Sequence, residues 1–156
     1  MPKAKKSWRE KLADDKGLPE IKVIDDRLSQ RWGQGTFVIP SPREVDALMK
    51  KVPKGRLTTI DEMRRRLAKR HWTSIACPLT TDILEWIAAH AAHEAETEGH
   101  KRVTPYWRTL KAKGELNPKY PGGIADLTRR LRAEGHRVVK KGKRYLVADF
   151  EQRLIT

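Results

Sequence analysis

The sequence predicts a mainly α-helical protein with a small β-hairpin: a winged helix-turn-helix-like domain with a basic N-terminal extension. Apolar residues recur at helical spacing over residues 60–70, 80–97 and 124–133. A basic hairpin is expected at 137–147, and three helices followed by such a hairpin form the outline of a winged helix. The chain also has 34 Lys and Arg against 20 Asp and Glu, a net charge of +14. A surplus of that size repels itself unless an anionic partner is near.

The first part of the chain is expected to be an extension in which basic residues alternate with small and acidic ones. Within it, residues 21–24 either form a short strand or pack on the body. Residues 36–39 are expected to form a short strand that Pro40 ends. The expected division is a basic N-terminal extension (1–35), a domain (36–148) and a C-terminal tail (149–156).

Capping residues mark the starts of two helices. Ser41 is the expected N-cap of the first, Pro42 takes its first helical position, and Glu44 completes a capping box. A second capping box runs from Thr59 to Glu62 and opens the helix at 60–70. Both starts are therefore predicted from local chemistry as well as from periodicity.

The second half of the chain alternates between helix and turn signals. The helix at 80–97 is the longest, and Gly99 ends it. Residues 105–123 are rich in Gly and Pro and have little periodicity, which predicts a long structured loop. The helix at 124–133 follows, and Gly142 lies in the turn of the predicted hairpin.

The charge is unevenly distributed along the chain. Residues 101–144 carry 14 Lys or Arg against three acidic residues, and residues 43–70 carry ten against four. Residues 71–99 carry no Lys or Arg and five acidic residues. Cations gather wherever a protein approaches phosphates, so the basic segments predict a nucleic-acid partner and the long acidic helix does not.

Composition makes other classes of protein less plausible. No segment approaches the roughly 20 apolar residues that span a bilayer, and no apolar segment follows the basic start, so we expect neither a membrane partner nor a signal peptide. The single cysteine, Cys77, is expected to be a small buried residue. These features favour a cytoplasmic location, nucleoid-associated if the source is bacterial.

No cofactor and no metal are expected. His90, His93 and Glu94 share the long helix, but metal-binding helices prefer i, i+4 spacing with a further ligand elsewhere. We interpret these histidines as solvated helix residues.

Four motifs between residues 52 and 139 occur in a characteristic order. They are Val52–Thr59, Thr104–Arg108, Gly114 with Tyr120–Gly123, and Glu134–His136. In this order and spacing, a little over half of the chain resembles the DNA-binding domain of the alkylguanine-DNA alkyltransferase and alkyltransferase-like family. The resemblance implies a helix-turn-helix scaffold, and it places Thr104–Arg108 where the family carries its Pro-Cys-His-Arg active site.

The departures from the family pattern affect the chemistry. The alkyl acceptor of the family is a cysteine thiolate, activated through a His and a Glu. Here Tyr106 replaces the cysteine and Trp107 the histidine, whereas Pro105, Arg108 and Glu134 are retained. A Tyr hydroxyl, with a pKa of about 10, is a poor acceptor without a base beside it. The resemblance therefore implies the condition of the alkyltransferase-like proteins, which bind damaged DNA without repairing it, and no enzyme.

Two residues that the family uses to extrude a base are also replaced. Asp82 stands where the recognition helix of the family carries its inserted Arg, and Ile60 stands where the first helix carries a Tyr. The resemblance thus implies a scaffold that has lost its tools for base flipping. Lesion sensing does not carry over to this chain.

The expected nucleic-acid contacts lie on the helix at 60–70, on the long loop and on the hairpin. Trp72, Trp86 and Trp107 could also stack on bases, but Trp86 shares the apolar stripe of the long helix and is expected in the core. Trp107 either forms a stacking platform or fills the vanished alkyl pocket. The full set of expected contacts is Arg64, Arg65, Arg66, Lys69, Arg70, Tyr106, Trp107, Arg108, Lys111, Lys113, Lys140, Lys141 and Lys143.

The sequence therefore predicts a non-catalytic nucleic-acid-binding protein, with DNA preferred over RNA and a link to DNA repair. The alternative is a structured-RNA or ribosome-associated protein, because RNA can be held by loops, hairpin and tail without a helix in a groove. An enzyme of another type is a third hypothesis. A protein-interaction module is the fourth, with the acidic helix at 80–98 as its partner face.

Overall fold

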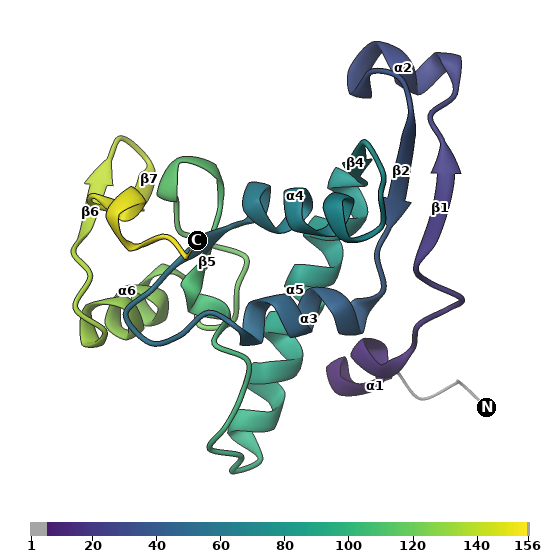
Figure 1. Ribbon diagram of the computed structural model, residues 1–156. Coiled ribbons are helices and arrows are strands. Elements are labelled where there is room, and N and C mark those ends of the chain that lie inside the picture. Colours follow the sequence, from purple (N-terminus) through teal and green to yellow (C-terminus); the bar gives the residue numbers. More distant parts are fainter. Residues whose placement is uncertain (1–5, 156) are drawn as a thin grey trace.

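A long helix, α5, runs through the middle of the molecule, and the other elements pack around it (Figure 1). The computed structural model describes residues 6–155. The helices are α1 (Trp8–Ala13), α2 (Asp26–Trp32), α3 (Pro42–Lys50), α4 (Ile60–Arg70), α5 (Pro78–Thr97) and α6 (Gly123–Ala133), with short 3-10 helices at Tyr106–Arg108, Ala112–Gly114 and Phe150–Arg153. The strands are β1 (Glu20–Val23), β2 (Thr36–Ile39), β3 (Thr58–Thr59), β4 (Ile75–Ala76), β5 (Thr109–Leu110), β6 (Val138–Lys141) and β7 (Arg144–Val147).

The predicted helices and hairpin are confirmed, and local chemistry explains two of the helix starts. Ser41 and Glu44 form the predicted capping box at the start of α3. Thr59 caps α4 by accepting a hydrogen bond from the backbone N–H of Glu62 at 3.2 Å. The carboxylate of Glu62 turns to Arg65 and Arg66, so only half of the second predicted box forms.

The strands form small sheets that join distant parts of the chain. β2 is the middle strand of a three-stranded sheet, antiparallel to β1 and parallel to β4. β3 pairs in parallel with β5, which ties the start of α4 to the residues directly after Tyr106. β6 and β7 form the hairpin, with Lys141 paired to Arg144 across the turn. In Figure 1 this hairpin and α6 lie on the opposite side of α5 from β1 and β2.

The main core lies between α3, α4, α5 and α6. Its fully buried members include Met49, Leu57, Leu67, Leu127 and Leu131. Leu57 lies just before β3, and the other four lie on the apolar faces of α3, α4 and α6. Burial of such faces supplies most of the driving force for folding. A smaller cluster joins Ile24, Phe37 and Cys77, which confirms the expected burial of the cysteine.

The described part of the first 35 residues is packed on the body. The Trp8 ring of α1 stacks on His90 of α5 at 4.5 Å between centroids and contacts Trp86 edge-on at 4.7 Å. β1 extends the sheet through β2. The boundaries of the predicted extension stay a prediction, but α1 and α2 were missed because helices of six and seven residues are too short to show a period.

The chain end is also held by the body. The backbone N–H of Leu57 donates to Arg153 O at 2.9 Å, and that of Ile155 donates to Leu57 O at 2.9 Å. Over residues 6–155, no helix has the length and apolar character that crossing a bilayer requires.

Candidate nucleic-acid interface

Tyr106 is fully buried at the position that the motifs align with the alkyl-acceptor cysteine. Its ring meets Trp107 edge-on at 5.3 Å and Tyr120 at 5.7 Å, and the guanidinium of Arg130 lies 5.5 Å from it. The hydroxyl has no hydrogen-bond partner among residues 6–155. Burial raises the pKa of Tyr106 to about 12. A hydroxyl without a base and with a raised pKa is a weak nucleophile.

Glu134 fastens the two residues that follow Tyr106. Trp107 Nε1 donates to its carboxylate at 2.8 Å, and Arg108 donates to both of its oxygens at 2.8 Å each. Arg108 also donates to Val52 O at 2.8 Å, and the backbone N–H of Gly55 reaches Glu134 at 3.4 Å. Burial opposes ionisation of Glu134, but the bonds from Arg108 and Trp107 outweigh it and hold the pKa of this carboxyl below its usual range. Glu134 therefore serves as a structural clamp for the loop at 107–108.

The loop residues predicted to contact nucleic acid face mostly inward. Tyr106 has no exposed surface, so the prediction that it contacts a nucleic acid is wrong for this conformation. The Arg108 side chain is only 14% exposed and is paired with Glu134. Trp107 is half-buried, and Arg130 lies over its ring at 4.6 Å. This packing favours the interpretation of Trp107 as a plug.

The arginine run of α4 divides between internal pairs and solvent. Arg64 donates to Asp61 at 2.8 Å and to Asp82 of α5 at 2.7 Å, and Arg66 donates to Glu62 at 3.1 Å. The Arg65 side chain is 73% exposed, and its ion pair with Glu62 lies at the surface. Lys69 and Arg70 are exposed and have no ion pair within residues 6–155. Only part of the run is therefore available to a phosphate backbone.

The basic hairpin presents exposed cations, of which only Lys140 has an aromatic contact within residues 6–155, 5.7 Å from the Tyr145 ring centroid. Lys140, Lys141 and Lys143 are exposed, as are Lys111 and Lys113 of the preceding loop, and none has an ion pair in the described part of the chain. A groove of about 790 Å³ runs between the hairpin and the 3-10 helix at Phe150–Arg153. Its lining is Lys113, Glu115, Lys141, Gly142, Lys143, Arg144, Leu146, Phe150 and Glu151.

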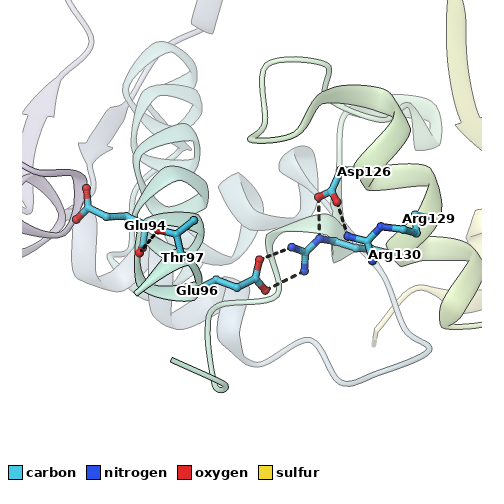
Figure 2. A network of polar contacts seen from close by, with 6 residues as sticks. All are labelled: Glu94, Glu96, Thr97, Asp126, Arg129 and Arg130. Carbon is cyan, nitrogen blue, oxygen red and sulfur yellow. Dashed lines mark hydrogen bonds and ion pairs between the residues drawn. The ribbon is translucent and has the colours of Figure 1, made fainter. Parts of the chain in front are cut away.

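All five carboxylates of α5 and its C-terminal cap have partners inside the molecule. Glu94 accepts from the backbone N–H groups of Trp8 and Arg9 at 3.1 and 3.3 Å, and Glu98 pairs with the Arg9 side chain. Figure 2 shows Arg130 of α6 held between Glu96 and Asp126, with its Nε 2.8 Å from Asp126. The two remaining carboxylates are Asp82, paired with Arg64, and Glu85, which accepts from the Tyr120 hydroxyl. The helix is therefore not the free acidic face that its sequence indicated.

The start of α5 bears an apolar surface that sequence reasoning missed. Leu79 is 71%, Ile83 46% and Trp86 36% exposed. The placement of Trp86 in the core is therefore wrong, because its contacts with Trp8 and His90 leave it 36% exposed. A cavity of about 820 Å³ opens beside these residues and is bounded on its other side by residues 111–119. The spacing i, i+4, i+7 from Leu79 was a detectable signal, but it is also typical of a core stripe.

Trp72 is the second residue whose exposure the sequence did not reveal. It lies in the turn between α4 and β4 and is 94% exposed. Within residues 6–155 no group of three or more His, Cys, Asp or Glu is placed to hold a metal ion.

Comparisons with known proteins bear on the fold. No known protein-family model matches the sequence, and no curated protein matches it. Among solved structures, the chain is similar to S. pombe Atl1 in complex with damaged DNA containing O6-carboxymethylguanine, with 14% identity and a TM-score of 0.50 over 74% of this chain and 94% of that one. It also matches S. pombe ATL in complex with DNA, with 14% identity and a TM-score of 0.49 over the same shares. The chain thus shares its fold with an alkyltransferase-like protein, in agreement with the resemblance that its motifs carry.

Proposed function

We propose that this chain is a non-catalytic DNA-binding protein built on the alkyltransferase scaffold and linked to DNA repair. The observation that carries the proposal is the closed acceptor position on a scaffold shared with Atl1, whose solved structure contains damaged DNA. A buried Tyr106 fills this position, and Glu134 is engaged by Trp107 and Arg108. Alkyl transfer needs a thiolate with a base behind it, and this site offers neither.

The arrangement of charge supports binding to DNA. In the proposal, α4 and α5 form the helix-turn-helix and the β6–β7 hairpin is the wing. Exposed cations without an ion pair among residues 6–155 lie on the hairpin and on the loop at 111–113, where they can neutralise phosphates. Asp82 at the start of α5 is paired with Arg64, so the helix repels a duplex less than its sequence charge indicates.

The test of catalysis is mass spectrometry after incubation with an oligonucleotide that carries O6-alkylguanine. We expect no mass gain on the protein. A stoichiometric gain on Tyr106 or Cys77 would contradict the proposal. Tyr106 is the residue that the motifs align with the acceptor, and Cys77 is the single cysteine of the chain.

The test of binding is competition among duplex DNA, single-stranded DNA and folded RNA at one salt concentration, since affinities at different salt are not comparable. We expect duplex DNA to compete best. A second comparison uses two duplexes, one with and one without O6-alkylguanine, to measure whether the protein prefers the lesion. We expect the two affinities to differ little. Both duplexes failing to bind would overturn the proposal.

A structured-RNA protein is the second candidate, and one observation favours it. The helix that would enter a groove of DNA, α5, has no Lys or Arg, whereas five exposed lysines without an ion pair among residues 6–155 lie on a loop and a hairpin. RNA is commonly held by such elements. Folded RNA displacing duplex DNA in the same competition would favour this candidate.

A further inference from the structure

Trp72 combines an unusual exposure with an unusual backbone. Its side chain is 94% exposed, whereas none of the other tryptophans in the described chain exceeds 36%. Its φ is 57°, in the left-handed region that bulky residues rarely adopt. Neither packing nor backbone preference accounts for a Trp at this position, and strain of this kind is typically retained at functional sites.

The turn that carries Trp72 is fixed on both sides. His71 Nε2 lies 2.6 Å from a carboxylate oxygen of the buried Glu44. The backbone N–H of Thr73 donates to Ala68 O at 2.9 Å, and its hydroxyl donates to Ile75 O at 3.0 Å. The ring therefore projects from a braced turn, whose backbone loses little conformational entropy when the ring meets a partner.

Two exposed cations of α4 lead up to the turn that carries the ring. Arg65 and Lys69, at i and i+4, lie along one face of the helix. The backbone N–H of Trp72, just beyond the end of α4, donates to Lys69 O at 3.3 Å, and all three side chains are exposed. We call these three residues the Trp72 strip. The carboxylate nearest to the strip along α4, Glu62, is shared by Arg65 and Arg66. Beside the strip, Arg31, Arg64 and Arg65 line a groove of about 390 Å³.

We infer that Trp72 stacks on an unstacked base of a bound nucleic acid while Arg65 and Lys69 hold the adjacent phosphates. The inference rests on the proposed function and adds a contact to it. An exposed aromatic face next to exposed cations is the arrangement that binds bases and backbone together. An unstacked base is required because a flat Trp face cannot reach the π-face of a base inside an intact stack. A duplex with one unpaired base, or a single strand, supplies such a face.

The test distinguishes the contribution of the Trp72 ring to binding from the effect of its strained backbone on stability. Asn and Gly both tolerate the left-handed region, so Trp72→Asn and Trp72→Gly remove the ring and relieve the strain together. We expect their affinity for a duplex with one unpaired base to fall about tenfold, with an unchanged salt slope and an unchanged or raised Tm. Trp72→Phe should retain part of the affinity, and Val23→Ala, which trims an exposed side chain of β1 outside the strip, should change nothing.

Fluorescence gives an independent readout. Stacking on a base quenches Trp emission, so the wild type should lose emission on binding and Trp72→Phe should lose less. Equal affinities of wild type and Trp72→Gly for duplex, bulged duplex and single strand would overturn the inference and leave the proposed function intact. A Tm that falls in parallel with affinity would also overturn it, because Trp72 would then be structural. No binding of any nucleic acid by the wild type would overturn both proposals.

Discussion

Helix α5 and the β6–β7 hairpin carry opposite charges, and the fold treats those charges differently. Each carboxylate of α5 has a partner inside the molecule: an arginine, a buried tyrosine or the backbone N–H groups at the start of α1. The hairpin lysines have no such partners in the described chain. Paired charges contribute to stability, and unpaired charges are available to a ligand. The net charge of a segment therefore does not show which of the two roles its residues play.

The largest effect is expected where a paired charge is buried. Glu134→Ala leaves the buried guanidinium of Arg108 without its partner, which should lower the free energy of unfolding by about 3–5 kcal/mol. Denaturant unfolding followed by circular dichroism measures it. Since the pKa of Glu134 is lowered in the folded protein, the stability it contributes is present at neutral pH and is lost as the pH falls through the folded-state pKa.

Glu98→Ala is the matched control for this substitution. Its pair with Arg9 is exposed on both sides, so the loss should not exceed about 1 kcal/mol. Equal losses for the two variants would contradict the distinction between buried and exposed pairs.

The next effect concerns the ring that lies beside Tyr106. Trp107→Ala should lower the free energy of unfolding by about 3 kcal/mol, because it opens a cavity and removes the bond to Glu134. Trp107→Phe keeps most of the packing and should cost about 1 kcal/mol. The salt slope of DNA binding should stay constant in both. Full stability with weakened binding would show instead that Trp107 stacks on a base.

The hairpin should show the reverse behaviour. Replacing Lys140, Lys141 and Lys143 by Ala together should flatten the log–log salt slope by about 2.7, at ~0.9 for each phosphate that is no longer neutralised. Between about 50 and 200 mM salt, the fall in affinity would become about 40-fold smaller. Stability should change by no more than about 1 kcal/mol, because these lysines have no ion pair in the described fold and Lys140 makes only an exposed cation–π contact with Tyr145.

A second triple variant controls for net charge. Lys16→Gly, Lys22→Ala and Arg27→Ala together remove the same charge from exposed positions in β1, in α2 and in the segment before β1, which lie on the opposite side of α5 from the hairpin (Figure 1). The same flattening in both triple variants would mean that overall charge governs binding and that the hairpin has no special role.

The fourth prediction concerns the pKa of Glu85, the most buried carboxylate of α5. Burial, helped by the charge of Asp82, raises the pKa of Glu85 well above its usual value. For a raised pKa, stability is fully present below the unfolded-state pKa and is lost as the pH rises through the folded-state pKa. Glu85→Gln should therefore raise the Tm by about 2–4 °C at pH 8, the response to ~1 kcal/mol, and by less at pH 4. A Tm gain that is equal at both pH values would contradict the raised pKa.

The smallest effect separates two neighbours on α4. Arg65→Ala should flatten the salt slope by about 0.9, because Arg65 is mostly exposed. Arg64→Ala should leave the slope unchanged, since Asp61 and Asp82 already hold that guanidinium. Equal slopes for Arg65→Ala and the wild type would mean that this face of α4 points away from the nucleic acid, which would also weaken the assignment of the Trp72 strip.

Local information in the sequence was sufficient to predict the elements that have a long periodic segment or a clear capping or turn residue. Helices α3 to α6 and the β6–β7 hairpin follow from apolar spacing, from Ser41 and Thr59 as caps and from Gly142 in the turn. These helices and the hairpin depend on neighbours along the chain, so the sequence alone determines them. The replacement of the acceptor cysteine by Tyr106 also rests on motifs in a fixed order, and it stays a prediction.

Only the tertiary structure decided which side chains are free. Glu94 is satisfied by backbone groups of α1, Glu134 by Trp107 and Arg108, and Asp82 by Arg64, in each case across 18 or more residues of sequence. The exposure of Trp72 and Trp86 was equally hidden, because an aromatic residue on a helix or in a turn has the same local signature whether or not another element covers it. Burial and pairing are properties of segments brought together by the fold, and spacing along one segment carries no record of them.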